Sequence, residues 1–396
     1  MRKILVLGAS KYQIPTILKA QSLGYAAVTA DNLPDNPGHK LANVSHKVST
    51  TDFSGLSAIA AQEKISGVIA PATDVAVTTA AMIAKAFGLP GPPIESAIIL
   101  TDKANFRSFL TGRGFPCPLS WPFTKPKFPL SCPPDSGPWI IKPNRSSGSK
   151  GIFRITHPAQ FKIYAQETLN FSLDKKGLIE QFIPGSQHTA EGLVFGGQVK
   201  VALITDRQTA PPPYVATWGH KVPSQLSALD QALVLDSLKK VFSLLNLWNG
   251  PFDCDFVFTA EKNIYFLELS PRIGGNSLSQ LFDAALQTDF LRYAVNLAMG
   301  DKNPNFSFSK QPKVVAISLL GVMNSGKAQW QAQAQEEFSK MPGVLSFEMD
   351  IKPGDQVEPF INGRRVLGQI LLTANSRLEL DHLQQKVHQI LDLKAV

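Results

Sequence analysis

The sequence predicts a protein of mixed α/β and α+β class, with a parallel sheet first and antiparallel strands after it. Over residues 1–100, short apolar runs alternate with helical patterns. Eight prolines then interrupt residues 115–138, and closely spaced strand patterns follow. Strands that alternate with helices form parallel sheets with crossover helices, whereas closely spaced strands form hairpins.

The parallel part rests on apolar runs that stop at turn residues. Its expected strands are Lys3–Leu7, Ala26–Ala30, Val44–Val48 and Gly67–Ala70, and its expected helices are Ile14–Leu23 and Val75–Phe87. Gly8-Ala9-Ser10 follows the first strand as a dinucleotide fingerprint would, but Lys11 and Gln13 occupy the later glycine positions. We therefore interpret it as a structural turn.

The remaining elements are shorter. Central strands and helices do not tolerate a high proline density, so residues 115–138 predict a linker or an extended connection. Residues 205–224, with three consecutive prolines, predict a long loop. Expected strands are Trp139–Lys142, Ile152–Ile155, Leu178–Phe182, Glu191–Phe195, Phe252–Phe258, Ile264–Leu269, Val314–Leu320 and Val366–Thr373. Expected helices are Ala228–Leu247, Ser277–Met299 and Leu378–Leu391.

Composition bounds the class of protein. The 396 residues suit roughly two to four units of ~100–200 residues, and an apolar content of 44% excludes wholesale disorder. A net charge of +8 fits a protein kept away from neutrality or a cleft for anionic substrates. No basic run with interleaved aromatics indicates nucleic-acid binding. No apolar stretch reaches the ~18 residues of a membrane span.

The chain start and the cysteines predict a compartment. The apolar run after Met1-Arg2-Lys3 is short and leads into Lys11, so it predicts a strand rather than a signal peptide. Cys117, Cys132 and Cys254 are widely spaced and form neither a zinc pattern nor a disulfide framework. We therefore expect the reducing cytoplasm.

Two segments could hold phosphate. Gly321 to Ala328 has P-loop spacing, but Ala328 replaces the hydroxyl residue that binds magnesium, so we interpret it as a chance match. The loop from Lys142 to Gly151 lies between two predicted strands and carries glycines and serines whose amides and hydroxyls can fold over phosphates. Lys142, at the end of the preceding strand, can meet phosphate or adenine N7.

A predicted hairpin carries the metal-binding chemistry. With its turn near Glu261, Asp255 and Glu268 come nearly opposite each other, with Cβ atoms ~5 Å apart. Two carboxylates at that separation repel unless a cation lies between them, and Mg²⁺ takes one or two carboxylates plus substrate phosphates. Ser270 points to the same face. Arg272, in the loop that continues through Gly274, Gly275 and Asn276, suits a transferring phosphoryl group or a substrate carboxylate.

In their order along the chain, these residues resemble the ATP-grasp superfamily. The order runs from Thr101-Asp102-Lys103 through Ile141-Lys142-Pro143, the serine/glycine loop and the Glu180-to-Gly185 connector to Asp255 and Glu268-Leu-Ser-Pro-Arg272. The resemblance covers nearly the whole chain. It implies an ATP-grasp fold with an N-terminal parallel α/β domain at 1–102, an ATP-grasp domain at 103–302 and a small C-terminal α+β domain at 303–396. A lid subdomain would span about 115–182.

The resemblance also implies site residues. Lys103 and Lys142 would contact ATP, the lid loop would close over its phosphates, and Glu180 to Ile183 would bond the adenine edge. Asp255, Glu268 and Ser270 would hold one or two Mg²⁺ ions, for which Mn²⁺ could substitute. The implied ATP-binding set is Lys103, Lys142, Ser146, Ser147, Gly148, Ser149, Lys150, Gly151, Glu180, Gln181, Phe182, Ile183, Gln187 and Leu267.

Three residues depart from the superfamily pattern. Gln187 stands where many relatives carry a ribose-binding Glu, Ser270 replaces an Asn metal ligand, and Thr217 replaces a Glu of peptide-forming relatives. The segment around Thr217 and His220 otherwise resembles the substrate loop of amino-acid ligases. The implied substrate contacts are Thr217, His220, Arg272, Gly274, Gly275 and Asn276.

The resulting hypothesis is a carboxylate–amine ligase. ATP would phosphorylate a carboxylate, and an amine would attack the acyl phosphate to form an amide, with Arg272 and Lys142 as catalytic residues. The partners would be small-molecule substrates, without nucleic acid or membrane, and a homodimer is left open. A carboxylase that uses bicarbonate and a non-catalytic nucleotide-binding protein are the alternatives.

Overall fold

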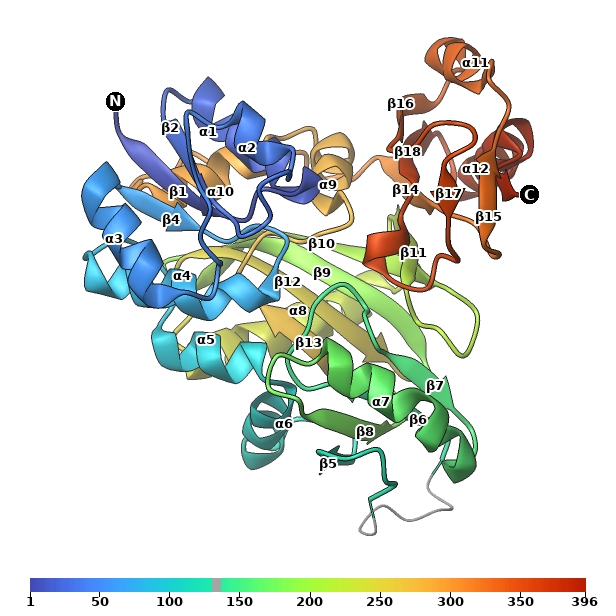
Figure 1. The fold of residues 1–396 in the computed structure, drawn as a ribbon, viewed down its shortest axis with the longest axis horizontal. Coiled ribbons are helices and arrows are strands. Elements are labelled where there is room, and N and C mark those ends of the chain that lie inside the picture. The colour runs from blue at the N-terminus through green and yellow to red at the C-terminus, as the bar shows by residue number, and fades with distance from the viewer. Residues whose placement is uncertain (130–136) are drawn as a thin grey trace.

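The computed structural model describes residues 1–129 and 137–396. Within them the strands form four sheets, and the helices cover the sheet faces. Figure 1 shows the N-terminal part in blue, a large central sheet, a smaller green sheet below it and the C-terminal part in red. The mixed α/β and α+β class is confirmed.

The N-terminal sheet is parallel, as predicted, with the strand order β3-β2-β1-β4. Its strands are β1 (Lys3–Leu7), β2 (Ala26–Ala30), β3 (Val44–His46) and β4 (Gly67–Ile69). The helices around it are α1 (Ile14–Ser22), α2 (Gly38–Leu41), α3 (Phe53–Glu63), α4 (Val77–Ala86) and α5 (Ile94–Thr101). Every residue of β2 is buried, which is typical of a strand covered on both faces.

A small antiparallel sheet follows helix α6 (Lys103–Gly112). Its order is β5-β8-β6-β7, and α7 (Phe161–Phe171) packs against it. The strands are β5 (Ser120–Phe123), β6 (Trp139–Pro143), β7 (Phe153–Ile155) and β8 (Gly177–Gln181). Strand β5 corrects the prediction of a linker over 115–138: it lies at the edge of the sheet, where a strand tolerates proline. The part of that prediction at 130–136 lies outside the described residues.

The large central sheet is antiparallel and has the order β13-β12-β9-β10-β11-β14-β18-β16. Its strands are β9 (Ser186–Phe195), β10 (Gln198–Thr209), β11 (Thr217–Val222), β12 (Gly250–Phe258), β13 (Ile264–Ser270), β14 (Val314–Leu320), β16 (Val344–Met349) and β18 (Gly368–Ala374). Helix α8 (Ala228–Leu244) contacts β10.

The prediction of a long loop over 205–224 is wrong. Strand β10 extends to Thr209 and β11 starts at Thr217, so the three prolines occupy only the connection between two interior strands. The prolines restrict their own segment and not the strands on either side of it. Both strands carry side chains of the site.

The predicted helix Ser277–Met299 is two helices, α9 (Leu278–Leu286) and α10 (Phe290–Ala298). Gln287 adopts a left-handed backbone conformation with φ of 50° and ends α9, and the Asp289 carboxylate accepts the Arg292 amide at 3.0 Å and starts α10. Such cap geometry ends a helix even where the apolar pattern continues.

The C-terminal residues complete the central sheet and add a small one. The other elements are β15 (Gly326–Gln329), β17 (Gln356–Val357), β19 (Lys394–Ala395), α11 (Ala334–Lys340) and α12 (Arg377–Leu391). Because Gly326 opens a strand in place of a helix, the interpretation of residues 321–328 as a chance P-loop match is confirmed. Pairing of β11 with β14 carries the central sheet across residue 302. The three-domain division stays a prediction.

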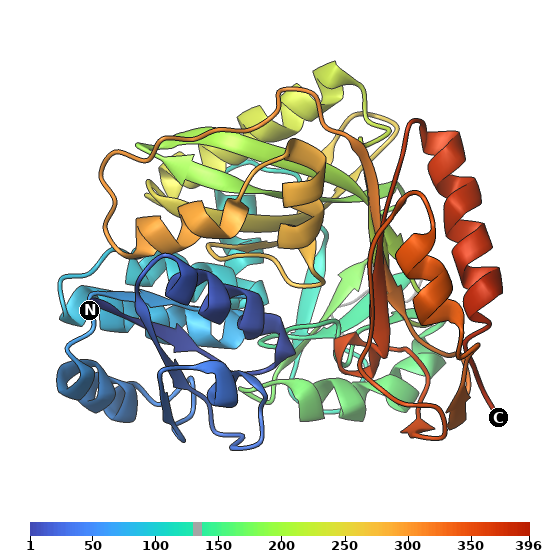
Figure 2. The same ribbon diagram turned by 90° about the horizontal axis from the view of Figure 1, so that it is seen from above.

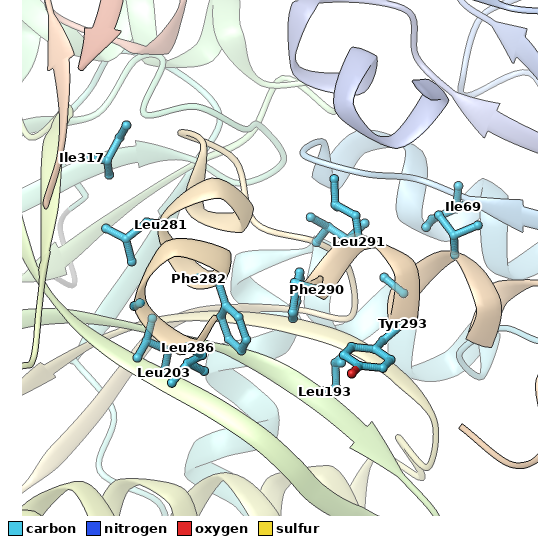
Figure 3. Close-up of a cluster of buried hydrophobic side chains, with 14 of the residues drawn as sticks. Ile69, Leu193, Leu203, Leu281, Phe282, Leu286, Phe290, Leu291, Tyr293 and Ile317 are labelled. Carbon is cyan, nitrogen blue, oxygen red and sulfur yellow. The ribbon is translucent and has the colours of Figure 1, made fainter. Parts of the chain in front are cut away.

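A shared core ties the N-terminal sheet to the central one. Helices α9 and α10 lie between them, as Figure 2 shows from above, and Figure 3 shows their side chains facing strands of the central sheet. Phe290 is fully buried here, and burial of such a side chain contributes ~1.5–3 kcal/mol. The labelled members are Ile69, Leu193, Leu203, Leu281, Phe282, Leu286, Phe290, Leu291, Tyr293 and Ile317. This core holds fixed the loops that meet at the site.

Candidate active site

A first cavity lies between the small and the central sheets. Residues predicted to bind ATP form most of its wall: Lys103, Lys142, Ser146, Ser147, Gly148, Ser149, Lys150, Glu180, Gln181, Phe182, Ile183, Gln187 and Leu267. Gly151 is not in the wall; its carbonyl accepts the Thr168 hydroxyl at 2.7 Å on the buried side of the loop. The fold therefore gathers residues that are far apart in sequence into one wall.

The floor of the first cavity is a buried ion cluster. The Glu180 carboxylate lies 2.6 Å from Lys142 Nζ and 2.9 Å from Arg107 Nε. Burial, and then the charge of Arg107, lower the pKa of Lys142 to about 8. Burial alone would raise the pKa of Glu180, but the two cations outweigh it and lower that pKa. Because one carboxylate faces two cations, the cluster has a net positive charge and attracts an anion.

The backbone of the predicted adenine segment is partly occupied. The amide of Gln181 donates to Leu119 O and that of Phe182 donates to Pro138 O, both at 2.9 Å. Arg154 stacks over the Phe182 ring, with its guanidinium carbon 3.9 Å from the ring centre. Because those two amides have partners inside the protein, Ile183 is the better candidate for an adenine-binding amide.

Helix α6 brings Lys103 to the other side of the cavity. Asp102 caps the helix through the Asn105 amide at 2.9 Å, and Asn144 Nδ2 donates to the same Asp102 carboxylate at 2.9 Å. The helix start is thereby joined to the lid loop. Lys103 Nζ lies 3.2 Å from Glu268 and 3.4 Å from Ser146 O.

The predicted pairing of Asp255 with Glu268 is confirmed in the register of β12 and β13. Both side chains are partly open, and each has a nearby cation: Arg207 at 3.4 Å from Asp255 and Lys103 at 3.2 Å from Glu268. Two carboxylates that reach a polar cavity are a donor set that Mg²⁺ accepts. Among residues 1–129 and 137–396, no three His, Cys, Asp or Glu side chains converge into a ready-made cage. A Mg²⁺ here would therefore take its other ligands from phosphates and water.

Ser270 does not line either cavity. It is buried opposite Asp253 in the β12–β13 ladder, and Asp253 instead reaches the second cavity. Burial raises the pKa of Asp253 to about 7. Asp253 lies two residues before Asp255 on the same strand, so the period of a strand could have indicated it.

A second cavity of about 710 Å³ opens beside the first. The two share the lid residues Ser147 to Lys150 together with Arg207, Asp255 and Glu268. The far wall comes from the N-terminal part, including the Gly8-to-Gln13 turn, Asp31 and Asp74. The turn that we interpreted as purely structural is therefore also part of a cavity wall.

Arg272 lies in the wall of the second cavity and is firmly held. Its Nε and Nη2 lie 2.9 and 2.7 Å from the same Asp74 oxygen, and its Nη1 lies 2.5 Å from Asp253. Burial alone would lower the pKa of Arg272, but the two carboxylates raise it. Burial would raise the pKa of Asp74, and the charge of Arg272 and the hydroxyl of Ser270 lower it instead. The guanidinium is thus a permanent cation in a fixed orientation.

Four of the other predicted substrate residues reach the second cavity: Thr217, His220, Gly275 and Asn276. Gly274 does not; its amide donates to buried Glu191 at 2.7 Å. Burial lowers the pKa of His220 to about 3, so its ring is neutral.

Arg207 was missed because it falls in the segment predicted as a loop. Its Nε donates to the Thr217 hydroxyl at 2.8 Å, and the side chain reaches both cavities. A cation at this junction suits the phosphate end of a nucleotide.

Comparisons with known proteins agree with this geometry. Residues 136–280 match the ATP-grasp domain family. The chain contains an ATP-grasp domain. This domain holds the lid loop, Asp255, Glu268 and Arg272, whereas Lys103 and the N-terminal wall lie outside the matched residues.

Named relatives extend the likeness beyond the ATP-grasp domain. The chain is 25% identical over 355 residues to the uncharacterized protein y4rH of Sinorhizobium fredii, covering 87% of this chain and 72% of that one. It is 21% identical over 328 residues to the L-arginine-specific L-amino acid ligase of Bacillus subtilis, covering 81% and 78%.

A solved structure shares the whole fold. The L-amino acid ligase of Bacillus licheniformis superposes with a TM-score of 0.84 at 18% identity, covering 100% of this chain and 98% of that one. The ATP-grasp fold is confirmed. No helix in the described part of the chain is long and apolar enough to cross a membrane.

Proposed function

We propose that this protein is an ATP-dependent carboxylate–amine ligase that forms an amide through an acyl phosphate. The observation that carries the proposal is the junction of the two cavities at the lid, Arg207, Asp255 and Glu268. A nucleotide in the first cavity would point its terminal phosphate toward a carboxylate in the second. Small-molecule acids and amines fit the 710 Å³ of the second cavity.

The residues would divide the work by position. Lys142 and Lys103 would bind the nucleotide, the lid loop would cover its phosphates, and Ile183 would meet the adenine edge. Asp255 and Glu268 would hold Mg²⁺, which, when bound, neutralises phosphate charge and orients the reacting oxygens.

Arg272 would orient the acceptor carboxylate. Its guanidinium is aimed by two acids, and one N–H on Nη2 is left to donate to an oxygen of a carboxylate or phosphoryl group. Holding two reactants in line can supply ~7–11 kcal/mol of the barrier. The carboxylate oxygen attacks the terminal phosphorus and ADP leaves; the amine then attacks the acyl carbon, phosphate leaves, and the amine loses a proton.

The test is an ADP-release screen of the whole protein with Mg²⁺ against amino acids and small carboxylic acids, each with and without an amine. We expect ADP only where an acid is present, and an amide of the summed mass less water. Release with bicarbonate alone would favour a carboxylase. Tight nucleotide binding without release in any arm would favour a non-catalytic nucleotide-binding protein.

A further inference from the structure

The N-terminal part supplies a contact that reaches the centre of the proposed reaction. Asp74 opens a short 3₁₀ turn (Asp74–Ala76) after β4 and lies nearly 200 residues before Arg272. Its Oδ1 accepts from both Nε and Nη2 of Arg272, at 2.9 and 2.7 Å. Only 8% of Asp74 is exposed, so water competes little for these bonds.

The loop that carries Asp74 is fixed from two directions. The Ala72 amide donates to Ile273 O at 3.1 Å, which joins this loop to the residue after Arg272. From the other side, Gln13 Nε2 donates to Pro71 O at 2.7 Å. Ala72 has a φ of 56°, a left-handed conformation that is costly for a residue with a Cβ. The surrounding contacts must therefore hold this loop shape.

Without Asp74, the guanidinium would be held only at Nη1, by Asp253 and by Ile273 O at 3.1 Å. Asp253 contacts Nη1, whereas Asp74 contacts Nε and Nη2 on the opposite edge of the guanidinium. Two acids on different edges fix the plane of a guanidinium, whereas one acid fixes only a point. The ATP-grasp domain supplies one of these acids and the N-terminal part supplies the other.

We propose that Asp74 is a positioning residue, which orients the Arg272 guanidinium toward the acceptor in the second cavity. The inference rests on the proposed ligase function for its kinetic consequence, but the geometry it asserts exists without turnover. Misplacing a charge stabiliser by ~1 Å can cost about 10²-fold in rate. The N-terminal part is thereby required for chemistry and not only for the cavity wall.

The first experiment is a double-mutant cycle of Asp74→Ala and Arg272→Lys, with ADP release and binding of a non-hydrolysable ATP analogue as readouts. We expect Asp74→Ala to lower kcat by roughly 10–100-fold and to leave analogue affinity within about twofold. In the Arg272→Lys background it should cost little more, because both changes act through one group. Asp74→Glu, which retains the charge, should recover part of the rate.

A matched control separates positioning from a loss of stability. Glu63 is also a buried acid of the N-terminal part, 2.7 Å from Lys3 and 3.1 Å from His46, away from both cavities. Glu63→Ala should lower the melting temperature without changing kcat. Losses that add fully in the cycle, or an equal kcat loss in Glu63→Ala, would overturn the proposal.

A second measurement needs no turnover. With arginine labelled at Nε, the Arg272 Nε–H resonance should exchange slowly in the wild type and rapidly in Asp74→Ala. The Arg107 signal, bonded to Glu180 at 2.9 Å, should not change. An unchanged Arg272 signal in Asp74→Ala would also overturn the proposal. If the wild type releases no ADP with any acid, the proposed function fails, and this signal still decides the role of Asp74.

Discussion

The two cavities differ in how their walls are assembled. The first is built almost wholly from residues 103–268, in short segments that each carry a recognisable pattern. The second draws on the N-terminal turn, the loop before α4, strands β10 to β12, and the loop around Gly363. A wall made of local motifs can be read from sequence, whereas one made at the meeting of distant loops cannot.

The chemistry differs in the same way. Every ion pair of the first cavity's floor lies within residues 103–268. Arg272 in the second cavity is paired with Asp74, which lies in the turn after β4 of the N-terminal part. We therefore expect changes at the junction to abolish turnover, changes in the first cavity to alter nucleotide affinity, and changes in the second to alter rate at constant affinity.

The largest effect should come from the junction. Glu268→Gln removes a carboxylate that faces both cavities and should abolish turnover, at a cost on the order of several kcal/mol in the transition state. The melting temperature should change little, since Gln still accepts a hydrogen bond from Lys103. Steady-state ADP release with Mg²⁺ measures the turnover of this variant. Asp236→Asn, the same kind of change at an exposed acid, is the control. Near-normal turnover of Glu268→Gln would remove the metal assignment.

The same contrast explains which parts of the molecule were predictable. The ladder position of Asp255 and Glu268 follows from the period of two strands and one turn, and it was predicted correctly. Strand β1 and strand β2 were also predicted at their observed bounds, because apolar runs ended by Gly8 or Asp31 leave little choice. Local regularity is what the sequence carries most directly.

Arg207, Asp253 and Asp74 were not predicted, each for a physical reason. Arg207 lies on a strand that was predicted as a loop because of three nearby prolines. The strand period places Asp253 on the same face as Asp255, but the contact of Asp253 with Arg272 is tertiary. Asp74 lies in the turn after β4, far along the chain from the loop after β13 that carries Arg272. Such tertiary contacts are set by packing of the α9–α10 core, which no local pattern encodes.

A large rate effect is expected next at Arg272, in the second cavity. Arg272→Lys should retain analogue affinity and lose roughly 10²–10³-fold in kcat, as when one preorganised charge stabiliser is removed. An ammonium cannot fill both the Asp74 and Asp253 sites, so it also loses its fixed orientation. Parallel measurements of ligation and analogue binding test this. An equal kcat in the wild type and in Arg272→Lys would exclude a role of Arg272 in phosphoryl transfer. It would also weaken the expectation that changes in the second cavity alter rate while changes in the first alter affinity.

A smaller effect, confined to the first cavity, should depend on pH. The pKa of Lys142 is lowered from 10.5 to about 8, so its charge is present below pH 8 and lost above it. Affinity for an ATP analogue should therefore fall as pH rises from 7 to 9, approaching tenfold per unit above the pKa if one proton is linked. Lys142→Arg should remove this step, and Lys142→Ala should bind weakly at both pH values. Calorimetry at several pH values measures this fall in affinity. If the affinity of the wild type does not change between pH 7 and 9, Lys142 does not bind the nucleotide.

The smallest effect on activity should come from a change at Tyr12. Here the N-terminal turn, the lid loop and the C-terminal loop around Gly363 meet at the wall of the second cavity. The Tyr12 hydroxyl donates to Gly363 O at 3.1 Å, and the Gly363 amide donates to Gly148 O of the lid loop at 2.9 Å. Burial, and then the charge of Asp350, raise the pKa of Tyr12 to about 12, so the hydroxyl remains a donor at ordinary pH. The hydrogen bond therefore links the N-terminal turn to the lid through the C-terminal loop.

Tyr12→Phe removes this one bond and keeps the ring. We expect a loss of about 1 kcal/mol of unfolding free energy, faster amide exchange at Gly363, and only a severalfold change in the KM of the acceptor acid. Tyr25→Phe is the matched control, because Tyr25 donates to Asn296 at 3.2 Å away from both cavities. It should lose similar stability without altering Gly363 exchange or KM. If the two variants behave alike in every measurement, the Tyr12 contact stabilises the fold without organising the lid, and the second cavity is bounded by its walls alone.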